Sequence, residues 1–156
     1  MDKIKNPWTH KDGYNCFGCS PDNPIGLHLH FYEDGDDVVA TWQPGANFQG
    51  WLNTLHGGIT STLVDEVAGW VVTRKLQTTG VTARLEMRFA RPIATNAGPL
   101  TVRARITGQR RQFVNISATV NDADGNTCAT GEVVYRTFNA EVAAEMGFTE
   151  CELEHE

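Results

Sequence analysis

The sequence has no apolar run near the roughly 20 residues that a membrane-spanning helix requires. Its first residues, MDKIKNPWTHKDGYN, are polar and lack the apolar core of a secretion signal. It also lacks an excess of positive charge, since 19 acidic residues outnumber 13 basic residues and give a formal charge of −6. These absences predict a cytoplasmic protein with no membrane partner, and they argue against nucleic acid as its main partner.

The residues that are present suit one folded domain. The chain has 156 residues, of which 40% are hydrophobic and 21% are charged, an ordinary mixture for a globular protein. It contains no internal repeat and no low-complexity segment. We expect an irregular N-terminal arm over 1–26, a single domain over 27–138, and an acidic tail over 139–156 that holds a short helix around 141–146.

The four cysteines form one suggestive pattern, Cys16-Phe-Gly-Cys19. A CxxC segment can be half of a zinc site, a redox pair, or two reduced thiols. A zinc site needs two more ligands, and the sequence has no second cysteine pair; the nearby candidates are His10, His28 and His30. Free or structural thiols are therefore favoured, and we predict no metal and no cofactor.

Alternating apolar and polar residues predict strands, and apolar residues at helical spacing predict one long helix from Gly57 to about Lys75. In the strand over 81–89, the alternation places Thr82 on the face opposite Leu85. The expected strands cover 27–32, 38–42, 81–89, 100–106, 114–120 and 128–138. Short loops favour antiparallel pairing. The predicted fold class is α+β, a curved antiparallel sheet of about five to six strands wrapped around one long central helix.

Three short patterns occur in order on these expected elements. They are His56-Gly57-Gly58 followed by Asp65, Cys16-Phe-Gly-Cys19 followed by Asn23-Pro24-Ile25-Gly26-Leu27-His28-Leu29, and Gly80-Val81-Thr82 at the start of a strand that ends near Arg91-Pro92. Together they make residues 16–138 resemble the PaaI-like branch of the 4-hydroxybenzoyl-CoA thioesterase superfamily, whose members have the hotdog fold.

The resemblance implies an enzyme that hydrolyses acyl-CoA, with a small, medium-length or aryl acyl group. It also implies a homodimer in which two sheets pair edge to edge, often within a homotetramer that is a dimer of dimers. Each active site would then take residues from both subunits. Acyl-CoA is the expected partner.

A carboxylate inside the apolar helix is central to the expected chemistry. Asp65 lies seven residues after Gly58, almost two helical turns, so the two residues share a face. We expect the Gly58 N–H to polarise a thioester carbonyl. Asp65 of a partner subunit would then act as general base on water or as nucleophile. The alternatives are Glu66, about 100° away around the helix, or two carboxylates that are only solvated or paired with basic residues.

Further roles follow from the resemblance. His56 would orient the loop or hydrogen-bond near the thioester, or it is a loop histidine with a backbone partner. Gln49 would contact the water or the carbonyl, with Asn53 as the substitute if the loop register differs. Thr82 would orient the attacking water, unless it belongs to the polar outward face of its strand.

Substrate contacts are expected around the helix start and at a basic rim for the phosphates of CoA. Some of these residues also have ordinary structural explanations, since small helical residues allow close packing and arginines in turns are commonly solvated. The expected contacts are Gly57, Ser61, Thr62, Arg91, Arg110 and Arg111.

A hotdog protein can also bind acyl-CoA without hydrolysing it, as a ligand sensor or a structural dimer. Asp65 favours the enzyme, because a protein that only binds has little need of a carboxylate two turns from Gly58. A hydratase is a weaker alternative, since it would pair an Asp with a His at a different spacing.

Overall fold

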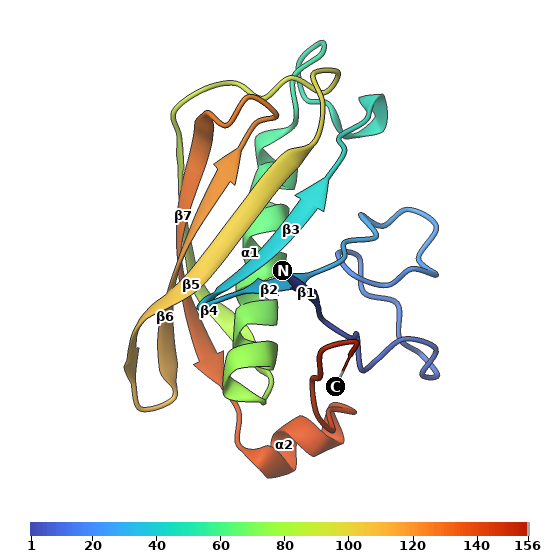
Figure 1. Cartoon of the computed structure of the whole chain (residues 1–156), viewed down its shortest axis with the longest axis vertical. Coiled ribbons are helices and arrows are strands. Elements are labelled where there is room, and N and C mark those ends of the chain that lie inside the picture. Colours follow the sequence, from blue (N-terminus) through green and yellow to red (C-terminus); the bar gives the residue numbers. More distant parts are fainter. Residues whose placement is uncertain (156) are drawn as a thin grey trace.

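The computed structural model describes residues 1–155, in which one long helix lies along one face of a single sheet (Figure 1). The seven strands follow the order β1-β2-β3-β5-β6-β7-β4, and every neighbouring pair is antiparallel. The elements are β1 (Asp2–Lys3), β2 (Tyr32–Asp34), β3 (Asp37–Trp42), the 3-10 turn η1 (Ala46–Phe48), α1 (Gly57–Leu76), β4 (Gly80–Phe89), β5 (Leu100–Arg110), β6 (Phe113–Asn121), β7 (Thr127–Thr137) and α2 (Ala140–Glu145).

The predicted α+β class is confirmed, and the sheet has one strand more than expected. The short strand β1 adds to its edge because two residues of the N-terminal arm pair with β2. The first predicted strand, 27–32, is wrong: its buried residues Leu27, Leu29 and Phe31 lie outside any strand, and pairing starts at Tyr32. Alternation alone cannot separate a buried extended segment from a paired strand.

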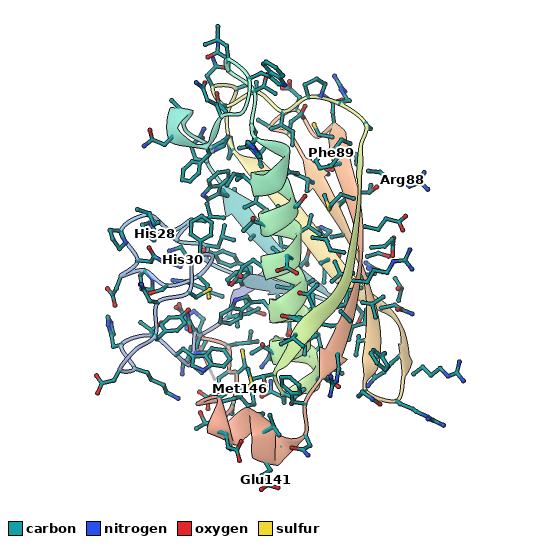
Figure 2. The ribbon with its side chains drawn as sticks, turned by 180° about the vertical axis from the view of Figure 1, so that it is seen from behind. His28, His30, Arg88, Phe89, Glu141 and Met146 are labelled. Carbon is teal, nitrogen blue, oxygen red and sulfur yellow. The ribbon has the colours of Figure 1, made fainter. Side chains whose placement is uncertain are left out.

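Helix α1 is buried on most of its circumference, which explains its apolar sequence. The sheet lies on one side of α1 and the N-terminal arm on the other (Figures 1 and 2). On the arm side, Phe31 stacks on Trp70 with ring centroids 4.6 Å apart, and Trp8 meets the same indole edge-on. The helix ends at Gln77, which adopts a left-handed conformation with φ of 52° and so stops the helical hydrogen bonding.

Close contact between α1 and the sheet depends on a glycine in β7. A Cβ added to Gly131 would lie 2.6 Å from Cγ1 of Val64 and 2.9 Å from Sδ of Met87, far inside normal contact distances. Leu63, Val64 and Val67 of α1 are fully buried. This packing fixes the position of Asp65 on the helix.

A β-bulge in β4 changes which face of the sheet Thr82 occupies from the face that we predicted. The pairing of β4 with β7 shifts between Thr82 and Arg84, so Thr82 lies opposite Tyr135 and Leu85 lies opposite Val133. Tyr135 and Val133 are two residues apart and share a face, and Thr82 therefore lies on the same face as Leu85. The prediction that they face opposite ways is wrong because the bulge inserts one extra residue.

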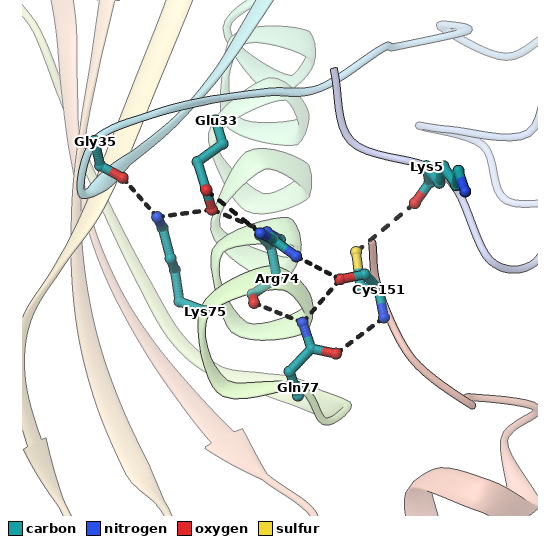
Figure 3. Close-up of polar contacts among 7 residues, drawn as sticks. All are labelled: Lys5, Glu33, Gly35, Arg74, Lys75, Gln77 and Cys151. Carbon is teal, nitrogen blue, oxygen red and sulfur yellow. Dashed lines mark hydrogen bonds and ion pairs between the residues drawn. The ribbon is translucent and has the colours of Figure 1, made fainter. Parts of the chain in front are cut away.

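The C-terminal tail pairs with the outer edge of β1. Lys5 N–H donates to the Glu152 carbonyl at 2.8 Å, and Glu154 N–H donates to the Lys3 carbonyl at 2.9 Å. Side chains at the end of α1 hold this tail, since Gln77 accepts a hydrogen bond from the Cys151 N–H at 2.9 Å (Figure 3). The chain therefore covers one edge of its own sheet. The division of the chain at residues 26 and 138 stays a prediction.

The opposite edge of the sheet is β4, and almost all of its residues are exposed. Its apolar residues Val81, Leu85 and Phe89 are 46%, 37% and 54% exposed. Figure 2 labels Arg88 and Phe89 near the end of this strand. Neither helix of the described residues combines the length and the apolar character that a membrane span requires.

Candidate functional site

The first turn of α1 holds an amide with a partner and an amide without one. Nδ1 of His56 accepts a hydrogen bond from the Gly58 N–H at 2.9 Å and so caps the helix. Among the described residues, the Gly57 N–H has no partner. The first N–H groups of a helix carry its partial positive charge and await an acceptor. The geometry thus disagrees with the predicted donor Gly58, whose amide is occupied, and makes Gly57 the available donor.

The His56 side chain therefore bonds to the backbone, which matches the alternative prediction of a loop histidine with a backbone partner. Its own N–H donates to the Phe48 carbonyl at 3.0 Å, which fixes the loop before the helix. Its φ of −62° and ψ of 130° lie in the extended region expected of a capping residue. The loop and the helix start are consequently joined through hydrogen bonds of His56.

Two hollows flank this helix start. The Phe89 ring borders the first hollow and would lie 3.7 Å from a Cβ on Gly57, an ordinary contact. That hollow is lined by Trp51, Thr54, Leu55, Gly57, Thr60, Phe89, Ala90, Arg91, Pro92 and Ile93. The second is lined by Asn47, Phe48, Gln49, His56, Gly58, Ile59 and Thr62. The structure thus places Gly57 with Arg91, and Gln49 with His56, Gly58 and Thr62.

Asp65 meets Thr82 on the helix-facing side of β4. The Thr82 hydroxyl donates to Oδ1 of Asp65 at 2.5 Å. Thr82 therefore does not belong to an outward polar face, which was the alternative. No described residue forms a salt bridge with Asp65 or Glu66, so the alternative in which basic residues pair with both carboxylates is wrong.

Tyr135 lies beside Asp65 in the same cavity. Burial and the negative charge of Asp65 raise the pKa of the Tyr135 phenol to about 12. The phenol therefore stays neutral at physiological pH. Nothing in the sequence pattern marks Tyr135 as this neighbour, because it lies in an ordinary alternating strand.

Within one chain, Asp65 and the Gly57 amide are too far apart to act on one carbonyl group. Asp65 lies eight residues after Gly57 in the helix, which is about 12 Å along the axis. A carboxylate that activates water must lie within hydrogen-bond reach of that water. A single chain therefore presents two separate halves of a site.

The three expected arginines do not gather in one chain. Arg91 borders the Gly57 hollow. Arg110 and Arg111 lie at the β5–β6 turn. Across the sheet, this turn is level with Arg136 of β7, which pairs with Val81 of β4, so it lies at the opposite end of β4 from Phe89. Those two ends are about 27 Å apart.

The other predicted contacts already have partners inside the chain. Oε1 of Gln49 accepts from the Asn53 N–H at 3.2 Å, and Asn53 itself is left-handed with φ of 57°. The hydroxyls of Ser61 and Thr62 donate to the Gly57 and Gly58 carbonyls at 3.0 and 2.9 Å. Gln49 and Thr62 still line the second hollow, whereas Ser61 lines neither.

Glu66 points toward the N-terminal arm, where it meets the two cysteines of the CxxC segment. The ligand atoms of Cys16, Cys19 and Glu66 all lie within 4.8 Å of one another, and among the described residues this group alone could hold a metal ion. A hydrogen bond with Cys19 lowers the pKa of the Cys16 thiol, whereas that bond and burial raise the pKa of Cys19. The sequence did not reveal Glu66 as the third member of this group, because it lies 50 residues from Cys16 along the chain.

The chain is similar to known proteins over most of the region that holds these features. The family model described as the thioesterase superfamily matches residues 52–129, half of the chain. A "putative esterase" of Saccharolobus solfataricus is 34% identical over 91 residues, which cover 56% of this chain and 59% of that protein. The chain thus spans less than two thirds of that relative.

Solved structures show the same architecture. The thioesterase superfamily protein RHA08564 gives a TM-score of 0.71 at 24% identity over 78% of this chain and 62% of its own. A hypothetical thioesterase protein of Streptococcus pneumoniae, solved with coenzyme A, gives a TM-score of 0.66 at 20% identity over 71% and 86% of the two chains. The predicted hotdog fold is confirmed.

Proposed function

This chain belongs to the thioesterase superfamily, and from that membership we propose that it hydrolyses an acyl-CoA whose acyl group is small, medium-length or aromatic. The observation that carries the proposal is that α1 holds two halves of a catalytic site, at Gly57 and at Asp65. One is an unpartnered Gly57 amide beside an apolar hollow, and the other is a carboxylate held by Thr82. The Streptococcus pneumoniae relative solved with coenzyme A supports CoA as the carrier of the acyl group.

We further propose a homodimer formed through β4, and a dimer of dimers as the larger assembly. An edge strand with exposed backbone groups and exposed apolar side chains is a ready template for a second strand. If two β4 strands pair antiparallel about Leu85, Thr82 of one chain lies opposite Met87 of the other, because the bulge leaves Thr82 only two ladder positions from Leu85; Phe89 follows Met87 on the same face. Since Phe89 borders Gly57, this pairing carries the partner subunit's Asp65 toward the Gly57 amide.

The same two-fold arrangement accounts for the basic rim. The β5–β6 turn lies at the Val81 end of β4, which antiparallel pairing sets beside the Phe89 end of the other chain. Arg91 of one chain and Arg110 and Arg111 of the other would then lie at one entrance. Guanidinium groups suit the phosphates of CoA.

In the proposed reaction, the Gly57 N–H donates to the thioester oxygen and stabilises the oxyanion that forms on attack. Asp65 of the other subunit either takes a proton from water as the water attacks the carbonyl carbon, or attacks that carbon itself to give a mixed anhydride that water then opens. In both routes the C–S bond breaks, and CoA leaves as a thiolate that takes up the proton. Thr82 positions the carboxylate.

Mixing two inactive variants tests the shared site directly. Asp65→Asn and Gly57→Pro should each be inactive alone, but a mixed dimer keeps one site with both intact residues. Random exchange in an equal mixture should restore about a quarter of wild-type activity, because half of the dimers are mixed and each has one working site of two. An exchanged mixture that stays inactive would refute a site built from two chains. Acyl-CoA binding without hydrolysis by the wild type would instead identify a binding protein.

Other parts of the proposal rest on the sequence patterns alone. They are the assignment to the PaaI-like branch, which rests on His56-Gly57-Gly58 followed by Asp65, and the cytoplasmic location. Localisation of a tagged chain in cells tests the second of these.

A further inference from the structure

Two thiols of the N-terminal arm and one carboxylate of α1 form a cluster that the hydrolysis does not use. Sγ of Cys16 lies 3.3 Å from Oε1 of Glu66. Cys19 is buried, with Cys16 and Glu66 partly buried. Their ligand atoms lie within 4.8 Å of one another. Ligands around a tetrahedral zinc ion lie about 3.6 Å apart, given Zn–S and Zn–O bonds of about 2.3 and 2.1 Å. The cluster therefore needs little rearrangement to surround an ion.

The carboxylate of Glu66 is held tightly against the loop between the cysteines. A Cβ added to Gly18 would lie 2.6 Å from Oε2 of Glu66, so only glycine leaves room for the carboxylate there. Trp70 Nε1–H donates to Oε1 of Glu66 at 3.3 Å. The loop CFGC thus wraps around a carboxylate that has no basic partner among residues 1–155.

The loop itself has the hydrogen bonds that a thiolate ligand requires. The Cys19 N–H donates to Sγ of Cys16 at 3.3 Å, and the Tyr14 hydroxyl lies 2.7 Å from Sγ of Cys19. The Leu27 and Leu29 N–H groups donate to the carbonyls of the two loop residues between the cysteines, at 2.8 and 2.9 Å. Such outer contacts orient metal ligands and tune their basicity.

We propose that Cys16, Cys19 and Glu66 bind one zinc ion, which fastens the N-terminal arm to α1. Thiolates select a soft divalent ion such as zinc over magnesium or calcium. On binding, the two thiols release their protons, and the ion supplies the positive charge that faces Glu66. The fourth position opens on the cavity that Tyr14 and Asp65 also line, and water fills it. Glu66 is the ligand that the CxxC segment lacked in the sequence.

Cobalt binding tests the site without any measurement of hydrolysis. The full chain is reduced, freed of metal with a chelator under argon, and titrated with Co²⁺. We expect thiolate-to-cobalt charge-transfer absorption and tetrahedral visible bands that saturate at one ion per chain and disappear when Zn²⁺ is added. Absence of these bands in the wild-type protein overturns the proposal, and this outcome does not depend on any variant.

Variants identify the ligands. Cys16→Ser and Glu66→Gln should each weaken cobalt binding by at least about 10–100-fold. Cys128→Ser is the matched control, because Cys128 is a buried free thiol elsewhere in the fold, and it should bind cobalt like the wild type. Equal binding by all three variants overturns the assignment. Zinc should also slow proteolysis of residues 1–26 in the wild type but not in Cys16→Ser. If Cys16 and Cys19 are found as a disulfide, and the protein still binds no cobalt after this disulfide is reduced, the proposal is overturned as well.

Discussion

Gly57→Pro should separate activity from stability at the helix start. Proline has no N–H, so the change removes the one amide that we assign to the thioester oxygen. Gly57 is the first residue of α1, where proline fits a helix without strain. The preceding residue, His56, has φ of −62° and ψ of 130°, which is the extended conformation that proline imposes on its predecessor. The added Cβ would lie 3.7 Å from the Phe89 ring, an ordinary contact distance.

The expected magnitudes have opposite signs. Loss of one oxyanion donor typically costs about 2.7–4 kcal/mol in the transition state, or about 10²–10³ in kcat. The free energy of unfolding should instead rise by about 0.4–1 kcal/mol, because proline restricts the unfolded chain. The Gly58 N–H keeps its acceptor on His56, so the helix cap is unaffected.

The assay is the release of free CoA thiol from a panel of acyl-CoA thioesters, together with urea unfolding of each protein. Gly57→Ala is the matched control, because it adds a Cβ at the same place but keeps the N–H, and it should retain most of the activity. Wild-type kcat in Gly57→Pro would refute the role of this amide. An equal loss in Gly57→Ala would show that crowding at Phe89, rather than the missing N–H, caused the effect.

Three further predictions concern the carboxylate, the sheet edge and an ion pair. Asp65→Asn should lower kcat/KM by about 10²–10⁴-fold with an unchanged melting temperature, and Thr82→Val should lower it less; a fully active Asp65→Asn in the thiol-release assay would exclude the carboxylate from the reaction. Leu85→Asp should convert the dimer to monomers in light scattering after gel filtration and abolish activity, whereas Ile25→Asp, an equally conspicuous apolar site at 75% exposure, should change neither; a monomeric wild type would contradict the assembly. Asp37→Asn should lower the free energy of unfolding by about 2 kcal/mol at pH 7. Burial raises the pKa of the Asp37 carboxyl, but hydrogen bonds and charges from Arg105 and Arg103 outweigh burial and set this pKa below its usual value. A carboxyl whose pKa is depressed in the folded state adds stability above its unfolded pKa of about 3.9, and this added stability is lost as the pH falls through the folded pKa. The difference in unfolding free energy between wild type and Asp37→Asn, measured with urea, should therefore be smaller at pH 3 than at pH 7.

Much of the fold could be predicted from local patterns. Helix α1 and the strands from β3 onward follow the apolar periodicity of the sequence, and Asp65 is recognisable because a charge in an apolar helix is unusual. The bulge in β4 could not be predicted, since one extra residue changes pairing without changing composition. The facing of Thr82 was therefore wrong, although its hydroxyl does meet the carboxylate.

The features of the site that could not be predicted have similar causes. Which glycine offers a free amide depends on where the His56 ring lies, and the sequence does not contain that rotamer. The Cys16–Glu66 contact joins residues 50 positions apart, so no spacing rule finds it. Charge alone grouped Arg110 and Arg111 with Arg91; a single chain separates them along the whole of β4, and the proposed dimer is what would bring them together.

The unequal edges of the sheet also limit how many copies can join. The C-terminal tail occupies the outward hydrogen-bonding groups of Lys3 and Lys5, so another chain cannot pair directly with this end of the sheet as it can with β4. Pairing through β4 is limited in number, because a two-fold pair consumes both β4 edges at once. In the proposed dimer, backbone pairing through β4 therefore ends with two chains, and a larger particle would be built by packing faces together. A truncation that removes residues 150–156 would expose the edge of β1, and we expect it to convert the proposed dimer into a polymer.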